Sequence, residues 1–404
     1  MADDHPQVAA GSRALELRHD IAVIGAGPAG SALAALLARQ GRDVALLEKD
    51  FFPRDKLCGE FLSTESQKLL KEIGCLDALL ARRPARITQS RFFTPAGRCI
   101  AMPLPGEALG LSRTALDEIL FRHAARSGAA AYEGARVAAI HPGRPQTAME
   151  VEFRDGSDRL SRVLRTSLAV GAYGRRSRLD RQLGRPFIDK NHPFIGLKRH
   201  HRPSATAAGR QAAAELRDSV EIHAFDGGYG GISGIEDDQL NVCFLLTKRF
   251  LDKIPSADWR HVRTAVETLS QSLSRRLDAL VPSEEAVHAV AQVPFDRKET
   301  SSGPVLFLGD AAAVIAPLCG DGQAMALRSA VLLAARINQT PSARWNEELS
   351  GIWKREWEAE FGGRIRLGRL LQDILLRPAA CEAAGRIIRL FPGLGSFLVK
   401  ATRG

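Results

Sequence analysis

Long apolar runs and clustered cysteines are both missing from this sequence. No stretch of about 18 or more uncharged apolar residues occurs, so we predict no transmembrane segment. Residues 1–20 are polar and lack the apolar core of a signal peptide. The six cysteines are scattered, without a CxxC pair or a Cys/His cluster, so we expect no metal site and no disulfide framework. These absences predict a cytoplasmic protein with reduced thiols.

Nucleic-acid-binding motifs are also missing, although the net charge is +10. The basic residues are mostly arginines spread along the chain, with no helix-turn-helix, no zinc finger and no arginine run with interleaved aromatics, so we expect no nucleic-acid partner. Two explanations of the charge remain, a solvated basic surface or attraction of anionic ligands. At 404 residues the chain is too long for one core, which predicts two or three packed units.

The N-terminal part of the chain has the order strand, glycine-rich turn, helix and strand. Ile21–Ile24 is a short apolar run, typical of a parallel strand buried on both faces, and it leads into Gly25-Ala-Gly-Pro-Ala-Gly30. An Ala/Leu-rich helix is predicted at residues 31–40, and Val44–Leu47 forms the second strand. This order is the fingerprint of a dinucleotide-binding fold.

Each part of this fingerprint has a physical role. Gly25 allows the tight turn, Gly27 lets the backbone approach a pyrophosphate, and Gly30 lets the helix pack closely on the strand. The N-terminus of the helix supplies free N–H groups and partial positive charge for the diphosphate. Glu48 ends the second strand, where its carboxylate accepts hydrogen bonds from a ribose diol. An ordinary glycine-rich turn would not explain Glu48.

A second glycine-punctuated unit lies near three-quarters of the chain. Residues 305–308 form an apolar strand, followed by Asp310, which is placed to accept from a ribityl hydroxyl. The turn at residues 320–322 leads into an apolar helix at 324–337, whose N-terminus is suited to the pyrimidine edge of a flavin. Taken alone, this unit also fits a structural crossover that connects two elements and binds no ligand. Together with the first motif it indicates FAD.

The two motifs together resemble the para-hydroxybenzoate hydroxylase superfamily of flavoproteins, over nearly the whole chain. Lys56-Leu-Cys-Gly-Glu60 resembles the Cys-Gly segment of geranylgeranyl reductases. The segment that begins Pro317-Leu-Cys-Gly-Asp-Gly resembles those reductases and the flavin-dependent halogenases. Leu111-Ser-Arg-Thr-Ala-Leu-Asp117 resembles the R-x-x-x-D segment of the family, so Arg113 is expected beside the flavin.

The motifs and the resemblance imply non-covalent FAD, with NAD(P)H as the electron donor. The residues expected to hold FAD are Gly25, Gly27, Pro28, Ala29, Gly30, Glu48, Lys49, Arg54, Cys58, Gly59, Arg113, Val137, Gly174, Asp310, Pro317, Gly320, Asp321, Gly322 and Gln323.

The sequence departs from the family in its middle motif, GADGxxSxxR. Tyr173 replaces the aspartate of that motif and Asp180 replaces its arginine, in a segment that serves both FAD and the nicotinamide in the resembled hydroxylases. The WxWxIP motif of halogenases is absent, and no lysine occurs between Lys71 and Lys190, where a halogenase would carry its catalytic lysine. The PxxYxWxFP signature of prenyl reductases is absent as well.

The segments between the motifs have a different pattern of apolar and polar residues. Ser219–Phe225 alternates partly, residues 227–231 are predicted to form a turn, and 239–246 a strand, as expected for antiparallel hairpins. Residues 258–280 predict one amphipathic helix. The predicted fold class is α/β, with a Rossmann-type FAD-binding domain, an inserted antiparallel substrate domain and a C-terminal helical region.

The expected boundaries follow from these elements. The FAD-binding domain takes residues 17–85, 106–185 and 294–340, the substrate domain takes 86–105 and 186–293, and a helical cap takes 341–404. The alternative for the cap is an amphipathic contact with a membrane or with a carrier protein.

These features predict an FAD-dependent monooxygenase that tailors an aromatic or polyketide-like molecule through a flavin C4a-hydroperoxide. The alternatives are an FAD-dependent C=C reductase or dehydrogenase of a hydrophobic, prenyl-like substrate, and a flavin-binding scaffold without turnover. The candidate catalytic residues are Cys58, as a proton donor or a small buried packing residue, and Glu60, as an acid or base. His192, His200 and His201 are candidate substrate contacts.

Overall fold

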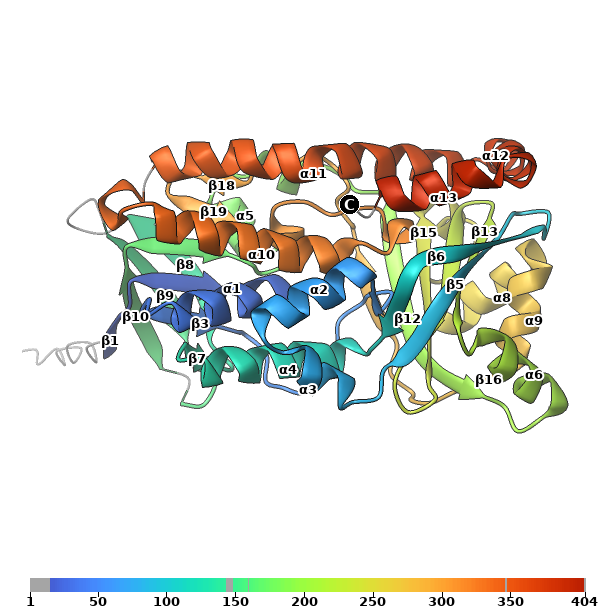
Figure 1. Ribbon diagram of the computed structural model, residues 1–404, viewed down its shortest axis with the longest axis horizontal. Helices are drawn as coiled ribbons and strands as arrows, with labels where there is room; N and C mark the ends of the chain where they lie inside the picture. The colour runs from blue at the N-terminus through green and yellow to red at the C-terminus, as the bar shows by residue number, and fades with distance from the viewer. Residues whose placement is uncertain (1–14, 143–147, 159, 346, 403–404) are drawn as a thin grey trace, which may run out of the picture.

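The computed structural model describes residues 15–142, 148–158, 160–345 and 347–402 (Figure 1). Its nucleotide-binding part is built on a six-stranded sheet in the order β18-β19-β11-β2-β3-β7. The strands are β2 (Ile21–Ile24), β3 (Val44–Leu47), β7 (Ala130–Tyr132), β11 (Leu168–Gly171), β18 (Ser301–Ser302) and β19 (Val305–Phe307). All of the pairings are parallel except that of β18 with β19. The strands β2, β3 and β11 are buried on both faces, which explains their continuous apolar sequences.

Helices α1 (Pro28–Arg39), α4 (Arg113–Arg126) and α10 (Gly322–Gln339) pack beside one another in this part of the molecule. The helix α1 begins at Pro28, three residues before the predicted start, because proline suits the first turn of a helix. Four of its five alanines are buried, and their small side chains let α10 and α4 approach closely.

A four-stranded sheet lies beside the nucleotide sheet and was not predicted. Its order is β1-β10-β9-β8, from β1 (Leu15–Arg18), β8 (Arg136–Pro142), β9 (Met149–Arg154) and β10 (Ser161–Thr166). The side chains of Ile140, Val151 and Leu164 are buried and extend the main core.

The second part of the molecule is a nine-stranded sheet, at the right of Figure 1. Eight of its strands follow the order β16-β12-β15-β14-β13-β5-β6-β4, and β17 pairs with β12. The strands are β4 (Phe61–Leu62), β5 (Ala85–Phe93), β6 (Cys99–Gly110), β12 (Phe194–Pro203), β13 (Ser219–Phe225), β14 (Gly228–Gly234), β15 (Leu240–Thr247), β16 (Leu280–Pro282) and β17 (His288–Ala291). The pairing is antiparallel except between β13 and β5.

Two of the predicted elements of this part are wrong. Of the predicted turn at 227–231, Gly227 lies in a turn, but residues 228–231 belong to the central strand β14, because these glycines admit close neighbours. A Cβ on Gly230 would lie 2.8 Å from Leu273, and one on Gly228 would lie 2.6 Å from the carbonyl oxygen of Leu245. The predicted single helix at 258–280 is two helices, α8 (Trp259–Leu269) and α9 (Gln271–Asp278), because Ser270 leaves helical geometry and caps α9.

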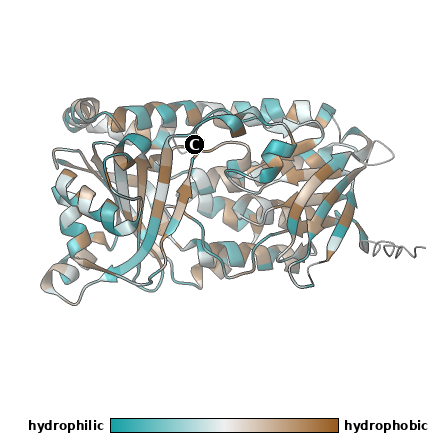
Figure 2. Ribbon diagram, turned by 180° about the vertical axis from the view of Figure 1, so that it is seen from behind, coloured by the Kyte–Doolittle hydropathy of each residue, from teal (hydrophilic) through white to brown (hydrophobic). Residues whose placement is uncertain are grey.

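The remaining helices cover the outside of these sheets. They are α2 (Thr64–Ile73), α3 (Leu76–Leu80), α5 (Arg178–Gln182), α6 (Ala207–Leu216), α7 (Lys248–Leu251), α11 (Glu347–Leu375), α12 (Pro378–Leu390) and α13 (Pro392–Ala401), with short 3-10 turns η1 (Pro186–Asp189), η2 (Gly309–Ala311), η3 (Pro317–Cys319) and η4 (Ser342–Arg344). In Figure 1, α11 runs along both parts and ends near α12 and α13. Strands in both parts carry apolar residues, whereas several outer helices alternate between polar and apolar ones (Figure 2). The predicted fold class is confirmed, and the exact domain boundaries stay a prediction.

Candidate functional site

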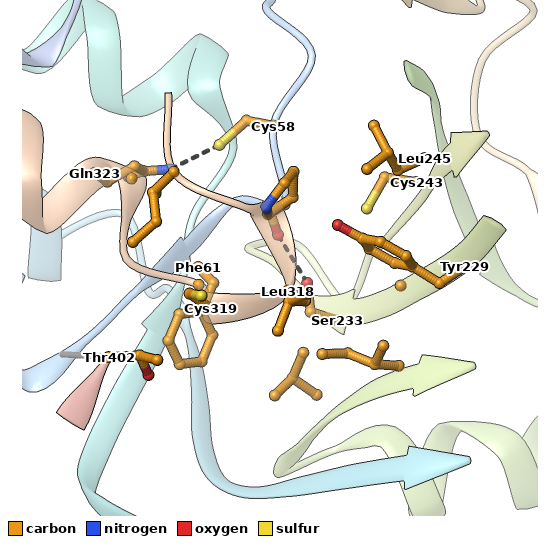
Figure 3. A pocket seen from close by; sticks show the side chains of 18 of the residues that line it. Cys58, Phe61, Tyr229, Ser233, Cys243, Leu245, Leu318, Cys319, Gln323 and Thr402 are labelled. Carbon is orange, nitrogen blue, oxygen red and sulfur yellow. Dashed lines mark hydrogen bonds between the residues drawn. The ribbon is translucent and has the colours of Figure 1, made fainter. Parts of the chain in front are cut away.

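A largely apolar cavity of about 390 Å³ lies where the two sheets meet the C-terminal helices. The nucleotide-binding part contributes Gly27, Cys58, Arg113, Asp310 and Gln323 to its lining. The nine-stranded sheet contributes Phe92, Tyr229, Ile232, Cys243 and Leu245, and the C-terminal helices contribute Leu375, Ile388, Leu398 and Thr402. Figure 3 shows Cys58 and Gln323 on one side of this space, and Tyr229, Cys243 and Leu245 on the other. No lysine is among the described residues that line it.

The glycine-rich turn at one end of the cavity has the geometry of a pyrophosphate cradle. A Cβ on Gly25 would lie 2.5 Å from the carbonyl oxygen of Ala172, and one on Gly30 would lie 1.9 Å from that of Gly25, so both positions require glycine. A Cβ on Gly27 would instead meet nothing nearer than the Arg113 guanidinium, at 3.9 Å. The space over Gly27 therefore remains open for a phosphate at the N-terminus of α1.

Glu48 is buried and bonded to the turn itself. Its Oε2 accepts from the Ala26 N–H at 2.8 Å and from Arg54 Nη2 at 3.1 Å, and its Oε1 accepts from the Asp50 N–H at 3.1 Å. Arg54 also donates to Asp117 Oδ2 at 2.7 Å. The carboxylate thus fixes the turn to the end of β3, and its role as a ribose acceptor stays a prediction.

Arg113 shares the carboxylate of Asp117 with Arg54. Its Nε and Nη2 donate to the two oxygens of Asp117, both at 2.7 Å, in a bidentate pair. Burial lowers the pKa of Arg113, but the charge and the hydrogen bonds of Asp117 raise it more, so the pKa stays above its ordinary value and the guanidinium remains charged. Arg113 therefore presents a fixed positive charge at the cavity wall, beside Gly27.

The loop after β19 supplies the opposite wall of the cofactor end. Asp310 lines the cavity, and the Arg175 Nε lies 3.6 Å from its carboxylate. Gln323, at the start of α10, is buried, and its Oε1 has no hydrogen-bond partner in the described part of the chain. An unpartnered buried amide oxygen beside a helix N-terminus fits a ligand that offers N–H donors, such as the pyrimidine edge of a flavin. The residues present at this end thus fit FAD.

Cys58 lies between this end and the nine-stranded sheet. Its Sγ accepts from Gln323 Nε2 at 3.1 Å and from the Glu60 N–H at 3.4 Å. The Cys58 carbonyl accepts from Asn241 Nδ2 at 2.9 Å. The Cys-Gly segment is therefore held to the substrate sheet through Asn241 and to α10 through Gln323, with the thiol in the cavity lining.

Glu60 occupies a left-handed backbone conformation, with a φ of 56°, and its side chain is fully buried. Its Oε1 accepts from Lys198 Nζ at 2.5 Å and from the Arg113 N–H at 2.8 Å, and its Oε2 is 2.7 Å from His200 Nε2. Burial lowers the pKa of Lys198, but the charges of Glu60 and Asp55 raise it more, so its net shift is upward. The buried carboxylate of Glu60 therefore has two basic partners, Lys198 and His200.

This network reaches the surface along two branches. In one, Lys198 Nζ contacts both oxygens of Asp55 at 2.7 Å, and Asp55 Oδ2 lies 3.2 Å from the half-exposed His288. In the other, His200 Nδ1 lies 3.3 Å from Glu284, whose side chain is 38% exposed. Burial lowers the pKa of His200, while its hydrogen bond and attraction to Glu60 raise it above the ordinary value. Two chains of titratable groups thus connect the cavity wall to solvent.

The departures from the family at 173 and 180 form one buried cluster. The Tyr173 hydroxyl donates to Asp180 Oδ1 at 2.9 Å, and Arg185 Nη1 donates to the same atom at 2.7 Å. Arg185 also donates to the Ala311 carbonyl at 2.8 Å, beneath the Asp310 loop. Asp180 is thus paired with Arg185, and the cluster supports the loop behind the cavity.

Lys298 supports the same loop. Its Nζ donates to the carbonyls of Arg175 and Asp310, each at 2.7 Å. Burial lowers its pKa to about 7. Neither Lys298 nor Lys198 was singled out from the sequence, because their partners lie far away along the chain.

The structure brings most of the predicted site residues together. Those that line the cavity are Gly27, Pro28, Ala29, Cys58, Gly59, Glu60, Arg113, Gly174, Asp310, Pro317, Gly320, Gly322 and Gln323. Those outside its lining are Gly25, Gly30, Glu48, Lys49, Arg54, Val137 and Asp321. Lys49 is exposed, and Val137 lies on β8 in the four-stranded sheet.

The three candidate substrate histidines also lie outside the cavity lining. His192 Nε2 is 3.0 Å from the Phe187 carbonyl oxygen, and the His201 ring packs at a tilt against Trp259 with ring centroids 5.3 Å apart. The individual functional roles stay predictions.

Comparison with known proteins assigns the class. Residues 18–340 match the family described as FAD binding domain, so the chain belongs to this family of flavoproteins. Conditioned medium factor receptor 1 of Dictyostelium discoideum is 27% identical over 395 residues, which cover 92% of this chain and 73% of that protein. Menaquinone reductase of Mycolicibacterium smegmatis is 26% identical over 390 residues, covering 92% and 88%. The resemblance to the para-hydroxybenzoate hydroxylase superfamily is thereby confirmed, and the chain is an FAD-dependent oxidoreductase in its coarse class.

Solved structures share the fold. A geranylgeranyl bacteriochlorophyll reductase-like protein from Thermoplasma acidophilum superposes with a TM-score of 0.75 at 16% identity, covering 91% of this chain and 90% of that one. The flavin-dependent brominase Bmp2 gives 0.76 at 17% identity, covering 95% and 93%. In the described residues no helix has both the length and the apolarity needed to span a membrane.

Proposed function

We propose that this flavoprotein reduces a carbon–carbon double bond in an apolar, prenyl-like substrate. The observation that carries the proposal is the shape and chemistry of the cavity. It runs from Cys58 and Gln323 at the cofactor end to Ile388 and Leu398 on the C-terminal helices, and its lining is mostly apolar. An extended apolar chain would exclude water from this space.

The residues of the cofactor end have separate tasks. Gly27 and the start of α1 would take the pyrophosphate, Asp310 the ribityl chain, and Gln323 the pyrimidine edge. FAD, when bound, supplies or accepts a hydride. Reduction of a double bond places the hydride on one carbon and a proton on the other. Cys58 lines the cavity beside Gln323, and we assign it the donation of that proton.

The Glu60 network is suited to returning the proton to Cys58. The Glu60 N–H contacts the Cys58 sulfur, and the Glu60 carboxylate connects to solvent through Lys198 and through His200. A buried donor that is used once per turnover has to be reprotonated, and hydrogen-bonded chains of bases provide a route for this. Glu60 would therefore act as a relay and not as the donor itself.

Two relatives support a reductase: a curated menaquinone reductase and a solved geranylgeranyl bacteriochlorophyll reductase-like protein. Halogenation is disfavoured because no lysine is among the described residues that line the cavity. The second candidate is the predicted monooxygenase of an aromatic molecule, which the apolar, water-excluding cavity also favours. The proposal includes NAD(P)H as the electron donor. It is the first donor to test, because Tyr173 alters the segment that serves the nicotinamide in the resembled hydroxylases.

The test is anaerobic reduction of the FAD-loaded protein followed by addition of a prenyl substrate. Dithionite and NADPH are compared as donors, with geranylgeraniol and a short-chain menaquinone as the probes. Reoxidation of the flavin with one equivalent of saturated product supports the reductase. Reoxidation that requires oxygen, with a hydroxylated product, would establish the monooxygenase instead.

A matched pair of cysteine variants tests the proton donor. Cys58→Ser should slow single-turnover reduction about a hundredfold with FAD content unchanged, because positioned proton donors contribute on that order. Cys243→Ser is the control, since this thiol also lines the cavity but lies on β15, away from Gln323. A loss of less than about threefold in Cys58→Ser would leave this thiol as a packing residue.

A further inference from the structure

The outer faces of α12 and α13, together with the residue that joins them, expose a concentrated set of large apolar side chains. The members are Ile387, Leu390, Phe391, Leu394 and Phe397, which we call the C-terminal apolar surface. Leu390 is 74% exposed, Phe391 65% and Phe397 63%. The described residues include twelve strongly exposed large apolar side chains, and five of them fall within these eleven positions. Such a concentration on a water-exposed face marks an interaction surface.

The inner faces of the same two helices close the cavity. Gly385 and Ile388 of α12, and Gly395 and Leu398 of α13, are among its lining residues. Both helices sit close to the sheet, because a Cβ on Gly385 would lie 2.8 Å from Thr94 and one on Gly395 would lie 2.6 Å from the Met102 sulfur. In Figure 1, the two helices lie at the end of α11, beside β6 and β13. One thin layer of helix thus separates the cavity from the C-terminal apolar surface.

The charges around this surface are positive. Arg386 and Arg389 are exposed on α12, and Lys400 is exposed on α13. The one acid of the two helices, Glu382, accepts from the Ala96 N–H at 2.7 Å and pairs with Arg98. Protruding Phe, Leu and Ile side chains edged by Arg and Lys match an anionic bilayer surface, where apolar groups enter the acyl region and cations meet the headgroups.

We propose that the C-terminal apolar surface docks on an anionic lipid bilayer as an interfacial contact. The mode is interfacial because no helix in the described part of the chain is both long and apolar enough to cross a bilayer. A further consequence rests on the proposed function: an apolar substrate would pass from the bilayer between α12 and α13 into the cavity without crossing water. The docking itself needs no assumption about the reaction.

Flotation of the FAD-loaded protein with vesicles tests the docking. We expect wild-type protein to float with vesicles of phosphatidylglycerol and phosphatidylcholine, and much less with phosphatidylcholine alone. Phe391→Ser/Phe397→Ser should lower the partition coefficient at least about tenfold, because two aromatic side chains that would enter the acyl region of the bilayer are lost. Arg386→Gln/Arg389→Gln should lower it about tenfold on the anionic vesicles only.

The controls separate docking from folding and from the reaction. Leu160→Ser removes a side chain that is 55% exposed in the loop between β9 and β10, and it should leave flotation unchanged. Every variant should keep its flavin absorbance and its turnover of a water-soluble short-chain substrate. If flotation succeeds and no substrate is reduced, the proposed function fails while the docking stands.

Two results would overturn the docking. One is wild-type protein that stays unbound on both kinds of vesicle. The other is a dimer in light scattering that Phe391→Ser/Phe397→Ser converts to a monomer, with no vesicle binding, which would make this surface an interface between two copies.

Discussion

Replacing Lys198 by methionine tests whether the buried network around Glu60 acts as one electrostatic unit. The Lys198 side chain is fully buried, and its ammonium contacts Glu60 at 2.5 Å and both oxygens of Asp55 at 2.7 Å. Methionine keeps most of the volume and removes the charge. The variant leaves Glu60 buried with His200 and one backbone N–H, and it leaves Asp55 with the half-exposed His288 and the Lys56 N–H.

The expected loss of unfolding free energy is large. Removing one partner of a buried ion pair costs about 3–5 kcal/mol, because the remaining charge stays in a region of low dielectric constant. Adding Glu60→Gln should recover part of this loss, since the buried charge then disappears. A coupling free energy of about 2 kcal/mol between the two positions is expected for groups in direct contact.

Urea unfolding of the FAD-loaded proteins measures these values. The control is Lys248→Met on α7, whose pair with Asp252 at 2.9 Å is exposed, so its loss should stay below about 1 kcal/mol. If Lys198→Met costs no more than this control, or if the effects of Lys198→Met and Glu60→Gln simply add, the network does not act as one unit and the relay loses its structural basis.

Four further predictions concern pH and glycine. His200 has a raised pKa, so its contribution to the unfolding free energy is fully present below about pH 6.5 and is lost as pH rises through the folded-state pKa. His200→Gln should abolish this pH dependence in urea unfolding. Burial lowers the pKa of its neighbour His201 to about 4, so wild-type stability should fall as pH drops from about 6.5 to 4, and His201→Gln should not show this fall. The lowered pKa of Lys298, about 7, makes its own contribution to stability rise from pH 7 towards about 10, so a stability difference between wild type and Lys298→Met that stays constant over this range would contradict that value. Gly27→Ala should weaken FAD binding about tenfold or more at unchanged apoprotein stability, whereas Gly30→Ala should destabilise the apoprotein, and isothermal titration with urea unfolding separates the two.

The nucleotide-binding elements could be predicted because their sequence signals are local. The run Ile21–Ile24, the glycine turn and the strand Val44–Leu47 lie within thirty residues of one another, and each pattern favours one kind of element. The prediction of a turn over residues 228–231 is wrong because glycine is as typical of a close packing contact as it is of a turn. Only the tertiary neighbours, Leu273 on one face and Cys243 on the other, select the strand.

The residues at the cofactor end of the site could be predicted from motifs. Most of the buried polar groups that hold those residues in place could not. Cys58 and Gln323 were each identified from a motif, but their contact joins positions 265 residues apart, and no local pattern reports it. Lys198 carries a signal only through its partner Glu60, which lies 138 residues away along the chain. Arg185 lies only five residues from Asp180, but its contact with the Ala311 carbonyl spans 126 residues.

The interleaving of the two large sheets limits how this architecture can evolve. The nine-stranded sheet takes strands from residues 61–62, 85–110 and 194–291, and the six-stranded sheet takes the stretches between and around them. Neither sheet is a continuous piece of gene, so neither can be exchanged by a single recombination event. New substrate ranges would arise through replacement of individual residues in the cavity wall. Those replacements fall mainly on the strands β13–β15 and on the helices α12 and α13, where side chains change without disturbing the cofactor end.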